Sequence, residues 1–220
     1  MRLLPVDEIQ IDLPIVNDSG GAERAERCDA AANRARILAV AEQLMSVRGV
    51  AEVTMADIAR AAGVGQGTLY RRFANKGELS LALMDRQFRE FQDTVMRQIN
   101  WMVGARAARL GQLEWVLESL IGFAEKHSAL LCEAERGGVD VPNAGPQAPP
   151  MMWQYLTIRG LLQAAVDAGE VSRETDVPVT ADMLLAPLHP STFSFYRRAR
   201  GYSIERINAA LRRIVGHLPR

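Results

Sequence analysis

Residues 63–73 read GVGQGTLYRRF, and the fold is decided by this stretch. Three glycines are followed by a threonine, a tyrosine and two adjacent arginines, in a chain whose formal net charge is zero. A stretch of this composition is either an ordinary surface loop with a basic end or part of a structure that contacts phosphate. The residues on both sides of it decide between the two.

Small and apolar residues flank the central glycine at the spacing of a helix-turn-helix. Ala59 stands four residues before Gly63, and Leu69 stands six residues after it. In such a motif the small residue lets two helices cross closely, the glycine takes the left-handed turn, and the later apolar residue seals the core. Many helical hairpins satisfy this spacing, so the neighbouring signals matter.

Helix-start signals stand on both sides of the motif. Thr54 has the character of an N-cap, and Asp57 occupies the reciprocal position of a capping box. Residues 75–78 form a second capping signature, which opens a long helix of about 25 residues, or roughly 37 Å. Before the motif, apolar residues within 37–45 recur with helical spacing and predict a helix that ends at Gly49.

The rest of the chain is also helical in pattern. Helix-forming residues dominate and runs with a period of two are missing, so we expect an all-α protein. The further helices are expected at about 110–124, 127–136, 151–168, 178–200 with a kink at its two prolines, and from 203 onward. Residues 137–150 hold too much glycine and proline for regular structure and form one long loop.

These patterns divide the chain into three parts. Residues 1–32 carry two prolines and a Ser-Gly-Gly break, and we expect a tail that can be disordered. Residues 33–90 form the helix-turn-helix domain, whose long last helix joins it to a second helical domain at 91–220. Apolar residues make up 48% of the chain and charged residues 24%, which is typical of a globular protein.

Cysteine usage and hydropathy bear on location. Cys28 and Cys132 lie far apart in no paired motif, so neither a disulfide framework nor a zinc site is indicated. The N-terminus mixes acids and prolines and is not a signal peptide. No run of about 18 apolar residues occurs. We expect a cytoplasmic protein that needs no cofactor and does not bind membranes.

Positive charge is concentrated around the motif. Residues 33–80 hold seven Lys or Arg and four Asp or Glu, so the rest of the neutral chain is acidic. The second short helix leaves these residues outside the core: Gln66, Gly67, Thr68, Tyr70 and Arg71. Such an exposed helix start can enter the major groove of DNA. Thr54 and Lys76 stand at helix N-termini, where backbone amides favour phosphate.

The sequence TMADIARAAGVGQGTLYRRFANKGEL, residues 54–79, resembles the DNA-binding domain of the TetR (tetracycline repressor) family of bacterial transcriptional regulators. The resemblance extends over about 33–90, and the layout of the last helices is similar to the family's ligand-binding domains. It implies a homodimer that places two recognition helices in successive major grooves of a double-stranded DNA operator. It also implies a C-terminal cavity where a small-molecule effector moves the long helix and releases the operator.

The family pattern implies roles for single residues. It places Thr54, Tyr70 and Lys76 on phosphates, and Gln66, Thr68 and Arg71 at or near base edges, with Gly67 and Arg72 beside them. The sequence departs from the pattern where Gly65 replaces a common Ser or Thr, and where Arg72 replaces a common His. The first departure weakens capping of the recognition helix by roughly 1 kcal/mol at most.

Plainer readings exist for several of these residues. Arg71 and Arg72 on their own would be a solvated pair, Tyr70 can cover the edge of the small core, and Thr54 caps its helix in either case. Further along, aromatic and sulfur-containing side chains could line an effector pocket: Phe123, His127, Met151, Trp153 and Tyr155. For any single one of these residues, ordinary core packing is the favoured reading. His127, Glu133 and Glu135 match no metal-ligand spacing.

The last helices carry the candidate dimer interface. The family builds a four-helix interface there, which implies contacts from Leu184, Leu185, Leu188, Ile207, Leu211 and Ile214. Burial within one chain is the alternative for the same residues.

Three functions compete at this stage. The leading hypothesis is a ligand-responsive transcriptional regulator, most simply a repressor. An all-α enzyme is a second, but the chain has no G-x-S-x-G, HExxH or P-loop motif. The third is a helical small-molecule-binding protein whose helix-turn-helix no longer binds DNA.

Overall fold

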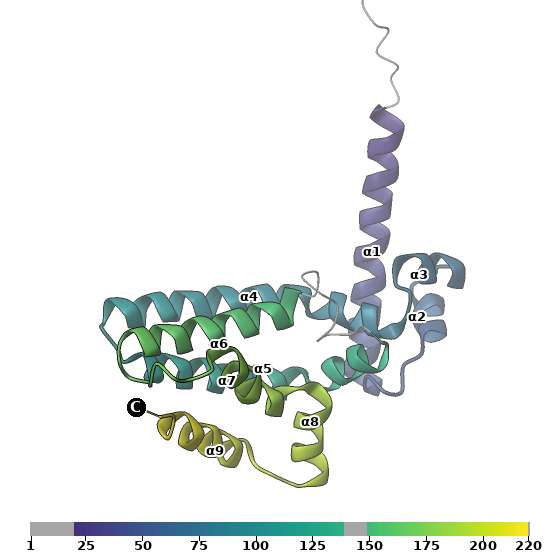
Figure 1. The fold of residues 1–220 in the computed structure, drawn as a ribbon. Helices are drawn as coiled ribbons and strands as arrows, with labels where there is room; N and C mark the ends of the chain where they lie inside the picture. Colours follow the sequence, from purple (N-terminus) through teal and green to yellow (C-terminus); the bar gives the residue numbers. More distant parts are fainter. Residues whose placement is uncertain (1–19, 139–148, 220) are drawn as a thin grey trace, which may run out of the picture. The chain divides into compact units, whose positions relative to one another are not determined.

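The computed structural model describes residues 20–138 and 149–219, all of whose regular elements are helices (Figure 1). Helix α1 spans Gly20–Arg48. The chain separates into two compact units after Arg36, so this helix begins in the first unit and ends in the second. Helix α1 begins at Gly20, inside the segment 1–32 that was expected as a tail. Residues 22–35 are rich in Ala, Glu and Arg, whose helix propensity needs no apolar period. The first 19 residues lie outside the described part.

The helix-turn-helix prediction is confirmed by α2 (Met55–Ala61) and α3 (Gln66–Arg72). Thr54 caps α2 as expected, since the Asp57 N–H donates to Thr54 Oγ1 at 3.1 Å and the Thr54 N–H donates to Asp57 Oδ2 at 3.1 Å. Gly63 has a φ of 64°, the left-handed conformation that the turn requires. Gly65 stands at the N-cap of α3 and offers no side-chain bond.

A small hydrophobic core holds these helices together. It is formed by the buried residues Ile37, Ala41, Met45, Val53, Met55, Ile58, Ala59, Ala62, Leu69, Phe73 and Leu79. Residues 37–48 of α1 supply one wall, and Leu69 on α3 is fully buried. Burying one leucine contributes about 1.5–3 kcal/mol, so this single residue anchors the recognition helix on its scaffold.

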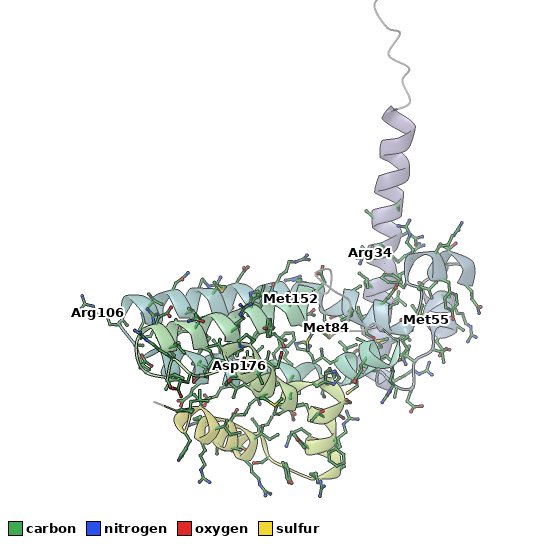
Figure 2. All side chains as sticks on the ribbon, in the orientation of Figure 1. Arg34, Met55, Met84, Arg106, Met152 and Asp176 are labelled. Atoms are coloured by element: carbon green, nitrogen blue, oxygen red, sulfur yellow. The ribbon has the colours of Figure 1, made fainter. Side chains whose placement is uncertain are left out.

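Two long helices lead away from this core. Helix α4 (Lys76–Gly104) begins where predicted, with the Asn75 side chain accepting from the Glu78 N–H at 2.9 Å. Figure 2 labels Met55 at the helix-turn-helix end and Arg106 at the turn between α4 and α5 (Arg109–Arg136). The prediction of a separate helix at 127–136 is wrong, because α5 continues through this segment. Residues 122–130 contain no proline that would interrupt it. Of the predicted loop, residues 139–148 lie outside the described part.

The helices that follow α5 complete the fold, and most of them pack against α5. They are α6 (Pro149–Asp167), α7 (Val177–Leu185), a 3-10 turn (Ala186–Leu188), α8 (Pro190–Ser194), a π-helical turn (Phe195–Ala199) and α9 (Ile204–Gly216). The two prolines interrupt the segment expected at 178–200, and Ser203 caps α9 as predicted. Within the described residues, no helix is both long and apolar enough to cross a membrane.

The start of α4 and the end of α5 meet backbone to backbone. A Cβ added at Gly77 would lie 2.9 Å from the Ala134 carbonyl oxygen and 2.9 Å from the Gly137 Cα. The Asn75 Nδ2 donates to the Gly137 carbonyl at 2.8 Å across the same junction. Only a residue without a side chain allows the two helices this approach.

A pair of glycine substitutions tests the junction. Gly77→Ala should lower the free energy of unfolding by about 1–3 kcal/mol, because its Cβ meets backbone atoms that cannot swing away. Gly67→Ala is the matched control, since nothing lies within 4 Å of the added Cβ, and it should raise stability by about 0.5–1 kcal/mol. Urea denaturation measures both. Equal stability of the two variants would show that α4 and α5 are not held this closely.

Candidate functional site

The exposed face of α3 gathers the predicted DNA-binding residues. Gln66, Gly67, Tyr70, Arg71 and Arg72 are exposed and Thr68 is half-buried, whereas Leu69 between them faces the core. Polar and cationic groups thus occupy one side of the helix and the apolar anchor the other. This arrangement suits a helix that enters a groove with its outer side, because the core beneath stays intact.

Two of these side chains have defined local settings. The Arg71 Nη2 donates to Thr68 Oγ1 at 3.2 Å, one helical turn back. That bond holds the guanidinium along the helix, where its other donors remain directed outward. Tyr70 is 49% exposed, so its ring is accessible to solvent.

Thr54 is engaged within its own capping box. Its hydroxyl donates to Asp57 Oδ2 at 2.7 Å and accepts from the Asp57 N–H. These hydrogen bonds from Thr54 lower the pKa of the Asp57 carboxyl, with smaller contributions from Arg48 and Arg60. The two arginines lie 3.8 Å and 3.9 Å from that carboxylate. The N-terminus of α2 therefore carries a fixed negative charge between two cations.

Lys76 is engaged with α5 rather than extended into solvent. Its Nζ lies 3.6 Å from Glu133 Oε2 and donates to the Ala51 carbonyl at 3.4 Å. The side chains of Lys76 and Glu133 are only 15% and 14% exposed. To contact a phosphate, the ammonium must give up Glu133. The residue predicted for phosphate binding is thus also an ion-pair partner of the second domain.

A cleft of about 340 Å³ opens between α4 and α5, which lie side by side. It is lined by Gln87, Glu90, Phe91, Thr94, Ser119, Gly122, Phe123, Lys126 and His127. The Phe123 ring stacks on Phe91 and His127, with centroid distances of 4.7 Å and 4.4 Å. Aromatic rings therefore form the floor, and polar side chains surround it.

The predicted effector residues divide in this cleft. Phe123 and His127 line it, and Trp153 packs behind it, 6.0 Å from the Phe91 centroid. Met151 and Tyr155 do not line it. Tyr155 packs against a second, larger hydrophobic core around α5, whose buried residues include Leu117, Ile121 and Leu162.

The sequence reasoning missed the lining residues of α4, among them Gln87, Phe91 and Thr94. Their spacing of four and three residues gives one helical face, and the Ser119–Gly122–Lys126 face of α5 repeats it. A helical face that mixes polar and aromatic residues was the signal in the sequence that could have identified these lining residues.

Burial shapes the electrostatics of the cleft. It lowers the pKa of His127, and the neighbouring Lys126 charge lowers it further. The imidazole is therefore neutral near pH 7 and can donate or accept one hydrogen bond. Glu133 and Glu135 are used elsewhere, since Glu133 pairs with Lys76 and Glu135 lies 3.4 Å from His189.

The candidate dimer residues also divide. Leu184, Leu188, Ile207 and Leu211 are buried in the core of their own chain. Leu185 is half-buried, and Ile214 is 54% exposed. Four of the six candidate residues thus belong to the hydrophobic core of their own chain. Of the six, Ile214 and part of Leu185 are accessible to a second copy.

Comparison with known proteins agrees with this geometry. The family model for bacterial regulatory proteins of the tetR family matches residues 37–83, which span the helix-turn-helix and the start of α4. The helix-turn-helix part of the chain is therefore a DNA-binding domain of the TetR type. An HTH-type transcriptional regulator of Staphylococcus aureus strain USA300 is 28% identical over 179 residues, covering 81% of this chain and 90% of that protein.

Solved TetR-family structures share the fold. Thermus thermophilus FadR, a transcriptional repressor in complex with lauroyl-CoA, has a TM-score of 0.61 and 19% identity, covering 85% of this chain and 96% of that one. RolR in complex with resorcinol has a TM-score of 0.56 and 22% identity, covering 89% and 90%. Similarity at this level of identity establishes the helical fold alone.

The Lys76–Glu133 ion pair gives a test of the phosphate role. Glu133→Gln should tighten DNA binding about 2- to 5-fold, because Lys76 then no longer has to break its ion pair with Glu133 to reach a phosphate. Such a pair contributes about 0.5–1 kcal/mol. A mobility-shift titration measures the change. Glu135→Gln, two residues along the same helix, should leave affinity unchanged. Weaker binding by Glu133→Gln, with a lower melting temperature, would assign Lys76 to a structural role instead.

The neutral state of His127 predicts a pH dependence. Because its pKa is lowered in the folded protein, the unfolded chain takes up a proton near pH 6.5 while the folded chain does not. The contribution of the neutral His127 to the free energy of unfolding is therefore fully present above about pH 6.5. It is lost progressively as the pH falls below that value. Urea denaturation between about pH 8 and 5.5 should show a smaller loss of stability in His127→Gln than in the wild type. His217→Gln, at an exposed site, is the control that should match the wild type.

Proposed function

We propose that the protein is a ligand-responsive transcriptional repressor, which binds a palindromic operator as a homodimer and is released by a small molecule. The observation that carries the proposal is the outer face of α3, where Gln66, Tyr70 and Arg71 are exposed above a sealed core. Arg and Gln in a recognition helix form bidentate hydrogen bonds with guanine and adenine in the major groove.

The operator is proposed to be a palindrome because the dimer carries two copies of α3. Two-fold symmetry places half-sites about one helical turn apart, or roughly 34–36 Å. The proposed interface uses the outward side of the last helices, with Ile214 of α9 and Met183 of α7 as exposed apolar anchors. Leu185 contributes at its edge, whereas the buried leucines keep each protomer folded.

The effector is proposed to bind in the cleft between α4 and α5. Its volume of about 340 Å³ and aromatic floor are typical of small-molecule sites. TetR-family structures of the same fold hold lauroyl-CoA in one case and resorcinol in another, so their ligands differ widely in size. A change of 100-fold in operator affinity requires a coupling of about 2.7 kcal/mol, which lies within the usual allosteric range.

One observation favours the alternative of a helical ligand-binding protein that no longer binds DNA. Lys76, a proposed phosphate contact, is paired with Glu133 and largely buried. Footprinting with purified protein on the DNA that flanks its own gene distinguishes the two functions. Symmetrical protection of two half-sites that weakens steeply with salt supports the repressor. Failure to shift any of these fragments at low salt supports the alternative.

Mutations on α3 separate positioning from specificity. Tyr70→Phe should weaken binding to operator and random DNA alike, because phosphates carry no base information. Arg71→Ala should instead relax discrimination at particular base pairs by about 1–3 kcal/mol if its contact is bidentate. Competition titrations with operator variants measure both. Identical effects of the two substitutions on specific and random DNA would show that another face of α3 meets the groove.

A further inference from the structure

A second cavity, of about 230 Å³, lies where α1 meets α4 and α5. Helix α1 contributes Glu42, Met45 and Ser46, and α4 contributes Leu83 and Gln87. Val50 follows α1, and Lys126, His127, Ala129 and Leu130 complete the wall from α5. Unlike the cleft described above, this cavity is bounded partly by α1.

The two cavities adjoin. Gln87, Lys126 and His127 line both, so a molecule in one touches the side chains that bound the other. Small-molecule sites usually enclose about 300–1,000 Å³, and the smaller cavity alone falls below that range. A ligand that passes Gln87 and occupies both would have an apolar surface at each end. Phe91 and Phe123 supply one, and Met45, Val50 and Leu83 supply the other.

Gln87 gives this shared wall a polar requirement. Its Oε1 is buried and accepts no hydrogen bond from any described group of the protein. Leaving a buried acceptor unsatisfied is costly, and a ligand that donates an N–H or O–H at this point removes the cost. The preferred ligand therefore carries a donor between its two apolar parts.

The charges around the site exclude a strong net attraction for ions. Glu42 and Lys126 line the α1 side, and Glu90 on the other side is paired with Arg86 at 2.8 Å. The burial that lowers the pKa of His127 keeps that imidazole neutral. An anion meets carboxylates and a cation meets Lys126, so an uncharged molecule is favoured.

We propose that the two cavities form one site for an uncharged molecule with apolar groups on both sides of a hydrogen-bond donor. The donor binds Gln87 Oε1, and one apolar group contacts α1 directly. The inference rests on the proposed ligand response and names its chemistry. Met45 lines the site and also belongs to the core that holds Leu69 of α3. Binding therefore reaches the recognition helix through α1, as well as through α4.

The donor requirement is tested by displacement of the fluorescent probe N-phenyl-1-naphthylamine, without DNA. Diphenylamine has two rings around an N–H, and N-methyldiphenylamine replaces that N–H donor by an N-methyl group. Diphenylamine should bind about 5-fold more tightly, as one hydrogen bond implies. The ratio should fall to about one in Gln87→Met and persist in Gln98→Met, which lies on α4 outside both cavities. An unchanged ratio in Gln87→Met, or tighter binding of the anion 2-anilinobenzoate, overturns the proposal.

The contact with α1 needs a second pair of variants. Ser46→Trp fills the α1 end of the site and should weaken diphenylamine about tenfold or more, while single-ring aniline is unaffected. Val47→Trp, on the exposed side of the same turn, is the matched control and should not change either affinity. Equal affinities for diphenylamine in the two variants overturn the α1 contact. Because no operator is present, these outcomes are independent of whether the protein binds DNA.

Discussion

One asparagine side chain joins the two halves of the described fold. Asn75 uses its Oδ1 to cap α4 and its Nδ2 to hold the Gly137 carbonyl at the end of α5. The same two helices touch through the backbones of Gly77 and Gly137, where neither can carry a Cβ. The small core under the recognition helix and the larger core around α5 are therefore joined here, beside the Lys76–Glu133 ion pair. A motion that separates the start of α4 from the end of α5 must break these contacts.

The position of the cleft follows from that constraint. Gln87 lies ten residues beyond Gly77, so about 15 Å of helix separates the ligand site from the junction. Near the junction the backbones of α4 and α5 touch, whereas further along the two helices leave a cleft lined by Phe91 and Phe123. A ligand that pushes these helices apart therefore also moves the start of α4, because α4 is one continuous helix. The core residue Met45 extends the same motion to α1.

Local signals were readable from the sequence, and distant pairings were not. The Thr54–Asp57 box, the Gly63 turn and the Asn75 cap depend on residues within a few positions, and all three were predicted and found. The contact of Asn75 with Gly137 joins residues 62 positions apart and has no local signature. Periodicity identified the apolar face that includes Leu184 and Leu211, but a period does not say which surface covers it, and the structure covers it within the chain. Gln87 escaped notice because a lone polar residue in a helix is ordinary until its burial is known.

Competition between carboxylates and phosphate ties these features to function. Around the helix N-termini, Asp57 lies near Arg48 and Arg60, and Glu133 holds Lys76. Each such ion pair weakens the attraction between its cation and a phosphate, because the cation already has a partner. Arg71 is held by a neutral hydroxyl instead, and its charge remains available to DNA. In the proposed repressor, Arg71 of α3 is therefore suited to reading the DNA sequence, whereas Lys76 contributes to overall affinity. Because Glu133 belongs to α5, a shift of that helix changes how much of the Lys76 charge the DNA can use.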